Sequence, residues 1–212
     1  MTTKPIIAID GPAAAGKGTL ARRLASRLGL PYLDTGLLYR AVGRRVLDAG
    51  GDPSNADHAE AAARSLVPAD LDRTDLRGPQ ADAAATAVAA IPGVRAALLD
   101  FQRDFAVRDG AVLDGRDIGT VIFPDAQAKL FVTASLAERA RRRWLELRGK
   151  GLEAEIKTVE EDMRQRDAKD AARAAAPLKA ALDAFLLDTS AMDADAAFLA
   201  ALAFIRTRIN MD

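Results

Sequence analysis

Short apolar runs alternate along the chain with longer segments in which apolar positions recur every three or four residues. The short runs are typical of strands buried on both faces. They predict strands at residues 6–9, 31–33, 111–113, 129–132 and 185–188, with a brief extended piece at 120–123. The longer segments are typical of amphipathic helices. They predict helices at residues 20–28, 36–47, 56–65, 80–90, 94–107, 135–147, 152–176 and 198–209.

Strands that alternate with helices are typical of an α/β protein built on a parallel sheet. The pattern predicts a five-stranded parallel sheet with helices on both faces. In such sheets, ligands bind beyond the carboxyl ends of the strands. Asp10, Asp34, Asp114 and Asp188 each follow the apolar core of a predicted strand, so they mark the edge where we expect the site.

The segment between the first strand and the first helix has the spacing of a phosphate-binding P-loop. Its two glycines let backbone N–H groups approach phosphate oxygens, its lysine brings an ammonium group to the outer phosphates, and the following helix adds its N-terminal N–H groups. An ordinary strand-to-helix turn is the alternative. The segment predicts a nucleoside triphosphate site made by Gly11, Pro12, Ala13, Ala14, Ala15, Gly16, Lys17, Gly18 and Thr19.

One position departs from the general P-loop pattern, in which Ser or Thr directly follows the lysine and holds Mg²⁺. Here Gly18 follows Lys17, and the hydroxyl group is on Thr19. This spacing resembles the nucleoside monophosphate kinases more than the switch GTPases. We therefore expect Mg²⁺ to be held mainly by phosphates and water, and we predict no protein metal ligand.

Composition narrows the function classes. The 212 residues carry 30 Lys and Arg against 30 Asp and Glu, so the net charge of zero argues against a nucleic-acid partner. The absence of Cys excludes disulfides and thiolate metal sites. The first apolar run leads straight into the P-loop, so we expect no signal peptide, and no apolar stretch has the length of a membrane span. We expect a soluble, cytoplasmic monomer.

Two further motifs follow predicted strands. The first, Asp34-Thr35-Gly36 with Tyr39 and Arg40, is expected at a substrate site, with simple helix capping as the alternative. The second is Asp114-Gly115-Arg116-Asp117-Ile118-Gly119-Thr120. Its guanidinium can hold a phosphate bidentately and its carboxylates can accept from an exocyclic amine. A turn held by an internal Arg–Asp pair is the alternative.

The spacing of Arg166, Asp170 and Arg173 predicts three charges on one helical face. This face is either a surface ion-pair ladder or an arginine face that neutralises charge in phosphoryl transfer. The arginine-rich run 139–143 either covers a nucleotide or is a solvated face. His58 is expected to be exposed, and the helical spacing of Trp144 places it in the core.

With these motifs in order, the chain resembles the bacterial cytidylate kinases, within the P-loop nucleoside monophosphate kinase group. The segments that carry the resemblance include Leu-Asp-Thr-Gly-Leu-Leu-Tyr-Arg, Ile-Pro-Gly-Val-Arg, Asp-Gly-Arg-Asp-Ile-Gly-Thr and Arg-Asp-Ala-Lys-Asp-Ala-Ala-Arg. The resemblance implies one P-loop kinase domain. Its core would be formed by about 1–35, 92–148 and 177–212, with a monophosphate-binding segment at 36–91 and a lid at 149–176.

The resemblance also implies transfer of the γ-phosphoryl group of ATP to CMP or dCMP. It assigns the monophosphate to Arg40, Arg116 and Arg166, and the cytosine edge to Thr86, Arg95 and Asp117. Asp34, Thr35 and Tyr39 would line the substrate pocket, and Asp170 and Arg173 would reach the sugar and phosphates. Lys17, Arg116, Arg166 and Arg173 would act in catalysis, and Arg139 would join the P-loop in binding ATP.

Two alternatives stay open. One is a related kinase whose acceptor is UMP, AMP or a small metabolite. The other is a P-loop switch that hydrolyses NTP, although no guanine-reading Asn-Lys-x-Asp stretch is present. The chain is also shorter between Arg40 and Arg77 than the family commonly is, which bears on how the monophosphate segment moves and on the choice between cytidine and deoxycytidine.

Overall fold

The computed structural model describes residues 4–209. The outer parts of the expected core, 1–3 and 210–212, lie outside this range. The chain forms two compact units, of which the first comprises Met1–Leu33 and Ala106–Asp212 and the second comprises Asp34–Phe105. The second unit takes in more of the chain than the expected monophosphate segment, because it includes most of the helix that follows residue 91.

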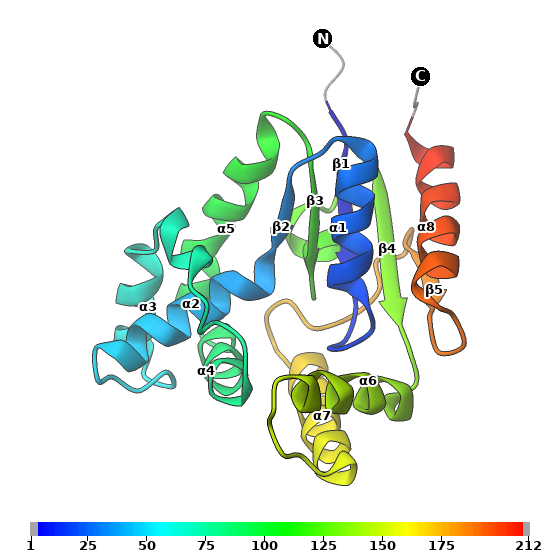
Figure 1. The fold of residues 1–212 in the computed structure, drawn as a ribbon. Helices are drawn as coiled ribbons and strands as arrows, with labels where there is room; N and C mark the ends of the chain where they lie inside the picture. Colours follow the sequence, from blue (N-terminus) through cyan, green and yellow to red (C-terminus); the bar gives the residue numbers. More distant parts are fainter. Residues whose placement is uncertain (1–3, 210–212) are drawn as a thin grey trace. The chain divides into compact units, whose positions relative to one another are not determined.

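The predicted five-stranded parallel sheet is confirmed. Its order is β2-β3-β1-β4-β5 (Figure 1). β1 lies between β3 and β4, and the register pairs Asp10 with both Gly115 and Phe131. The end of β1 is therefore the central point of the carboxyl edge. The strands are β1 (Ile6–Asp10), β2 (Tyr32–Asp34), β3 (Ala111–Gly115), β4 (Ala128–Thr133) and β5 (Phe185–Asp188).

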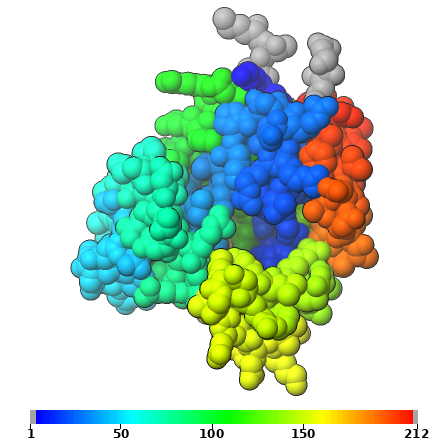
Figure 2. Space-filling model, in the orientation of Figure 1, coloured from blue at the N-terminus to red at the C-terminus, as the bar shows by residue number. Residues whose placement is uncertain are grey.

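Two helices, α1 (Lys17–Leu28) and α8 (Ala194–Arg208), cover one face of this sheet. Ile7 and Ile9 point toward them from β1, and Leu24 of α1 and Ile205 of α8 pack into the same fully buried cluster. The surfaces of α1, in blue, and α8, in orange and red, meet in Figure 2. This apolar layer fixes the start of α1, and with it the P-loop, against the end of β1.

The remaining helices of the first unit are α6 (Leu136–Gly149) and α7 (Ile156–Ala171), which pack against each other. Our prediction of one helix over 152–176 is wrong at both ends. After α7 the chain turns back. The Leu178 N–H donates to the Asp170 carbonyl, which would accept from a residue four positions later if the helix continued. Ala176, with φ of 55°, lies in the left-handed region directly before Pro177.

The prediction of an extended piece at 120–123 is also wrong. Residues Ile118–Ile122 form a short π-helix, η2, in which the Phe123 N–H donates to the Ile118 carbonyl five residues earlier. The β-branched residues of this segment are typical of a strand and led to the wrong prediction. Ile118 and Ile122 are instead buried one helical turn apart. Such turns are frequent at functional sites.

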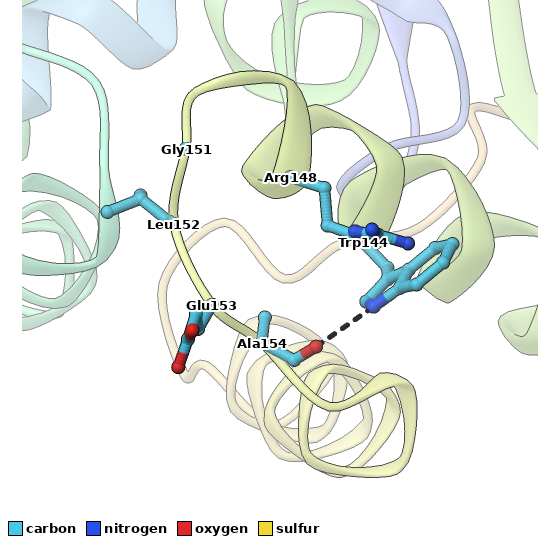
Figure 3. A pocket seen from close by; sticks show the side chains of 6 residues that line it. All are labelled: Trp144, Arg148, Gly151, Leu152, Glu153 and Ala154. Atoms are coloured by element: carbon cyan, nitrogen blue, oxygen red, sulfur yellow. Dashed lines mark hydrogen bonds between the residues drawn. The ribbon is translucent and has the colours of Figure 1, made fainter.

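Trp144 was predicted in the core but is only half-buried. Its indole Nε1–H donates to the Ala154 carbonyl at 2.9 Å, and the Arg148 guanidinium lies 4.8 Å from its ring centroid. Figure 3 shows both residues lining a small pocket where the chain leaves α6 and approaches α7. The tryptophan thus ties this connection to α6.

After Asp34, the last residue of β2, the regular structure of the second unit is helical. It contains α2 (Thr35–Asp48), α3 (Ala56–Arg64), the 3-10 helix η1 (Pro68–Asp72), α4 (Pro79–Ala89) and α5 (Pro92–Val107). α2 and α4 approach closely at Gly43, where an added Cβ would lie 2.7 Å from the Ala84 Cβ. His58, on α3, is exposed as predicted.

Within residues 4–209 no single helix is long and apolar enough to cross a membrane. α4 and α5 meet the test of length and composition only as a pair, which is bent by 100° at its break.

Candidate active site

The P-loop begins where β1 ends, and its backbone requires glycine. Gly11 has φ of +143°, and an added Cβ would lie 1.9 Å from the Val132 carbonyl oxygen of β4. Gly16 has φ of +91° and directly precedes α1. A side chain at position 11 would collide with the backbone of β4, so the packing of the loop against the sheet requires glycine there. The approach of the loop to phosphate stays a prediction.

Lys17 is the first residue of α1 and is only 6% exposed. Its Nζ donates to the Pro12 carbonyl at 2.7 Å, so the ammonium group folds back over the loop. Thr19 is exposed. Gly18 lies beside β3, because an added Cβ there would be 3.6 Å from Asp114 Oδ2. The position where other P-loops carry the metal-binding hydroxyl therefore faces a carboxylate at the end of β3.

Arg142 is a residue whose place the sequence left undecided within the arginine-rich run. Its Nη1 lies 3.9 Å from the position of a Cβ on Gly16, so its guanidinium reaches the P-loop. Nη1 also donates to the Thr189 hydroxyl at 2.9 Å, and Nη2 donates to the Thr189 carbonyl at 2.7 Å. The Thr189 hydroxyl itself lies 3.1 Å from the Ala15 carbonyl oxygen.

Glu138 supports the same arginine from within α6. Arg142 Nε donates to Glu138 Oε1 at 2.9 Å, and Arg141 donates to both carboxylate oxygens. The hydrogen bonds from Arg141 and Arg142 lower the pKa of Glu138 to about 2. Arg142 therefore stands beside the P-loop with a fixed orientation, held by α6 on one side and by the residue after β5 on the other.

Arg139, predicted to bind ATP, is buried. It donates to the Ala134 carbonyl at 2.9 Å, to the Ala13 carbonyl at 3.4 Å and to Asp167 Oδ2 at 2.7 Å. These contacts join the P-loop to α6 and α7. Its role toward ATP stays a prediction.

At the end of β3, Arg116 pairs with an aspartate outside its own motif, which the internal-turn alternative did not foresee. Its Nε donates to Asp170 Oδ2 at 3.1 Å, and its Nη1 donates to the Gly115 carbonyl at 3.2 Å. Asp117, only 5% exposed, is the residue before η2. Two motifs more than fifty residues apart in the sequence therefore meet at this point.

Asp170 is the shared partner in this cluster. It is 7% exposed, and it accepts hydrogen bonds from Arg116 and from Arg173. The surface-ladder alternative is therefore wrong. Arg166, one turn earlier on α7, is half-buried, whereas Arg173 lies beyond the end of the helix. A buried carboxylate that gathers two guanidinium groups makes a site that fits an anion able to compete for them.

Asp10 is a site residue that the sequence marked only as a strand end. Its Oδ1 accepts from the Ile118 N–H at 2.7 Å and its Oδ2 accepts from the Gly119 N–H at 2.8 Å. Burial raises the pKa of Asp10 to about 7, although those two hydrogen bonds act in the opposite direction. Nearby Asp117 raises the pKa further, and Lys17 lowers it.

The second unit holds the other predicted substrate residues. Arg40 on α2 donates to Asp82 of α4 through Nε at 3.0 Å, and the Thr86 hydroxyl donates to the Asp82 carbonyl at 2.8 Å. Asp82 was missed by the sequence analysis, although its spacing of four residues from Thr86 on a predicted helix was a usable signal. α2 and α4 thus bring both residues to Asp82, Arg40 to its carboxylate and Thr86 to its backbone carbonyl.

Four more predicted residues lie on the same unit. The Arg95 guanidinium is 5.7 Å from the centroid of the Tyr39 ring, so these two residues stack across α5 and α2. Thr35 is buried at the start of α2. Asp34 precedes it and lies 3.5 Å from Arg77, whose side chain is half-exposed. The capping alternative for Asp34 is not seen, since its side chain makes no cap hydrogen bond.

The comparisons with known proteins agree on a family. A sequence profile described as cytidylate kinase matches residues 7–206. A cytidylate kinase of Granulibacter bethesdensis is 63% identical over 203 residues, which cover 96% of this chain and 97% of that protein. Another, of Paramagnetospirillum magneticum, is 63% identical over 207 residues, covering 96% and 98%.

Solved structures agree on the fold. A gluconokinase of Sinorhizobium meliloti has a TM-score of 0.50 at 14% identity and covers 98% of this chain and 94% of its own. An uncharacterized protein of Eubacterium ventriosum reaches a TM-score of 0.56 at 18% identity, covering 97% and 99%. The first is a kinase, and both likenesses bear on fold alone. With the family profile spanning nearly the whole described chain, the protein belongs to the cytidylate kinase family.

Proposed function

We propose that the protein transfers the γ-phosphoryl group of ATP to CMP and dCMP, giving ADP and the cytidine diphosphates. The observation that carries this proposal is the buried Asp170 with its two arginines, in a chain that also has a P-loop and belongs to this family. A P-loop supplies a triphosphate site, and a separate arginine cluster supplies a second anion site. A hydrolytic switch needs only the first.

The P-loop and α1 would hold the ATP phosphates through backbone N–H groups. Lys17, now on the Pro12 carbonyl, would move its ammonium group to the β- and γ-phosphates. Arg142 stands beside Gly16 and adds a second positive charge on the α6 side. These groups act by neutralising the charge that spreads over the transferred phosphoryl group.

The acceptor oxygen belongs to the monophosphate and is already a nucleophile, so no covalent enzyme intermediate is needed. Arg40, Arg116 and Arg166 would hold that monophosphate, with Asp170 and Arg173 toward the sugar and phosphates. In the structure the Arg116 Nε donates to Asp170, so the incoming phosphate competes with a carboxylate for the same donor. The protein's contribution is alignment, charge neutralisation and exclusion of water.

Base selection would rest on Asp117, Arg95 and Thr86, with Asp34, Thr35 and Tyr39 lining the pocket. Cytosine offers an amino donor beside two acceptors, whereas uracil reverses the donor and acceptor at the first two of these positions. A carboxylate facing the amino group and an arginine facing the acceptors would leave buried groups unpaired with uracil. Such mismatches can reject the wrong substrate by up to about 10⁴–10⁵-fold.

Mg²⁺ is the expected cofactor, and it supplies Lewis-acid charge on the transferring phosphates. Within residues 4–209 no cluster of three or more His, Cys, Asp or Glu side chains could hold a metal. Mg²⁺ commonly takes only one or two carboxylates and otherwise phosphates and water. Asp114 is buried beside Gly18 and accepts a hydrogen bond from the Tyr32 hydroxyl at 3.1 Å, and it is the carboxylate that would help to hold the hydrated ion.

The proposal is tested by incubating the protein with ATP, Mg²⁺ and CMP and separating the nucleotides by anion-exchange chromatography. We expect equal amounts of ADP and CDP, and little ADP when CMP is omitted. Lys17→Ala protein serves as the control for contaminating kinases. ADP that forms at the same rate with and without CMP, with no CDP, would contradict the proposal and favour the NTPase switch.

A further inference from the structure

Asp10 lies at the junction of the P-loop with the Arg116–Asp117 segment, and we propose that it is a positioning residue for the acceptor nucleotide. In this role its carboxylate fixes the direction in which Arg116 and Asp117 leave the end of β3. The inference rests on the proposed function, because it takes those two residues to bind the monophosphate and the base. It adds a residue that touches neither substrate.

The position of Asp10 is set by the sheet. It is the last residue of the central strand β1, it pairs in register with Gly115 of β3 and with Phe131 of β4, and it is 4% exposed. The next residue, Gly11, is held against the Val132 carbonyl oxygen of β4. The strand register before Asp10 and the close packing of Gly11 after it place the Asp10 side chain at the centre of the carboxyl edge.

Both carboxylate oxygens are used on the same short segment. Oδ1 accepts from the Ile118 N–H at 2.7 Å, and Oδ2 accepts from the Gly119 N–H at 2.8 Å. These are the first two residues of η2, whose N–H groups have no carbonyl partner within their own turn. A side chain from another strand thus holds the start of η2, directly after Asp117.

Gly119 packs closely against both Asp10 and Lys129. An added Cβ on Gly119 would lie 3.4 Å from Asp10 Oδ2 and 3.2 Å from Cδ of Lys129 on β4. The segment is therefore held between the Asp10 carboxylate and the Lys129 stem, and it has little room to shift. Arg116 and Asp117 are the two residues between Gly115, the end of β3, and Ile118, whose N–H is bonded to Asp10. Their backbone is therefore held at both ends.

A purely structural role is the competing explanation, since any buried carboxylate that accepts two N–H groups stabilises the fold. The two explanations differ in which kinetic constant changes. A structural role lowers the amount of active protein and leaves the Michaelis constants alone. A positioning role raises KM for the acceptor and weakens base discrimination. KM for ATP is largely retained, because Gly11 packs closely against the Val132 backbone of β4 and the Asp10 side chain takes no part in that contact.

The test is Asp10→Asn. The amide keeps the size of the carboxylate but offers one acceptor oxygen, and its NH₂ group must face one of the two N–H donors. We expect KM for CMP to rise roughly 10-fold or more, and the preference for CMP over UMP in kcat/KM to fall by a similar factor. KM for ATP should change by less than about 3-fold on the same reasoning.

Asp193→Asn is the matched control. Asp193 also accepts two backbone N–H groups, from Asp195 and Ala196, but it does so at the start of α8. Asparagine caps helices as well as aspartate, so we expect wild-type KM values for both substrates in this variant. Unchanged KM for CMP in Asp10→Asn, or equal rises in KM for CMP and ATP, overturns the proposal.

Gly119→Ala provides a second measurement should Asp10→Asn fail to fold. The added methyl group presses on Asp10 and Lys129 without removing either, and we expect the same selective rise in KM for CMP. An unchanged KM for CMP in this variant also overturns the proposal. Failure of the proposed function is seen separately, because the wild-type protein would then not phosphorylate CMP at all.

Discussion

Replacement of Arg116 by alanine tests the anion site that gathers around Asp170. The substitution removes a guanidinium whose Nε–H donates to Asp170 at 3.1 Å and whose side chain is 22% exposed. With CMP bound, the same group would hold the monophosphate. The variant therefore separates acceptor binding from ATP binding, provided that the fold survives.

The expected loss of affinity for CMP follows from the number and kind of hydrogen bonds that Arg116 makes. One charge-assisted hydrogen bond contributes about 1.5–3 kcal/mol, which corresponds to a factor of about 10–150 in affinity. Because Arg116 exchanges Asp170 for the phosphate, the net gain on binding lies toward the lower part of that range. We expect KM for CMP to rise about 10- to 50-fold, with kcat and KM for ATP each changing less than about 5-fold.

The assay is ADP release coupled to NADH oxidation. CMP is titrated at a saturating concentration of ATP, and ATP is titrated at a saturating concentration of CMP. Arg141→Ala is the matched control, because Arg141 is an exposed arginine of α6 that also pairs with a carboxylate. Circular dichroism and the Tm show whether α7 stays folded when Asp170 is left with Arg173 as its arginine partner. An unchanged KM for CMP, or equal losses for CMP and ATP, would refute the assignment of Arg116 to the acceptor.

Three further predictions concern the P-loop side of the site. Lys17→Ala should lower kcat by about 10²–10³-fold with little change in KM for CMP, measured in the same coupled assay; a loss confined to KM would contradict its catalytic role. Thr189→Val removes the hydroxyl that holds Arg142, and should cost about 2- to 10-fold in kcat/KM for ATP but not for CMP. The raised pKa of Asp10, about 7, means that the folded state keeps a proton the unfolded state releases above about pH 4. Stability should therefore fall between about pH 4 and 7, by up to about 1.4 kcal/mol per pH unit, and Asp10→Asn should remove that part of the slope in urea unfolding; parallel pH profiles would contradict it.

The local signals in the sequence predicted most of the fold. Apolar runs located the five strands, most clearly β1 and β3, which are buried on both faces. The glycine spacing located the P-loop, where Gly11 has no room for a side chain. The errors fell where the chain departs from periodic structure. The β-branched residues of η2 read as a strand, and the alanine-rich end of α7 read as helix although the chain turns back at Asp170.

The sequence singled out most residues of the candidate site but none of the contacts between them. Arg116 and Asp170 were both singled out, yet nothing in their spacing shows that they pair across 54 positions. Asp10 was read only as the end of a strand, because its importance depends on the N–H groups of a segment 108 and 109 residues away. Asp82 was missed for a similar reason, since its partner Arg40 lies on another helix.

In the proposed function, the protein phosphorylates the monophosphates of cytidine and deoxycytidine and selects them by their base. The most direct measurement is kcat/KM with CMP, dCMP, UMP, AMP and GMP offered separately, at fixed ATP and Mg²⁺. We predict that CMP and dCMP exceed the other three acceptors by at least about 100-fold. A comparable or higher value for UMP or AMP would leave the kinase fold standing but would contradict the assignment of Asp117, Arg95 and Thr86 to the cytosine edge.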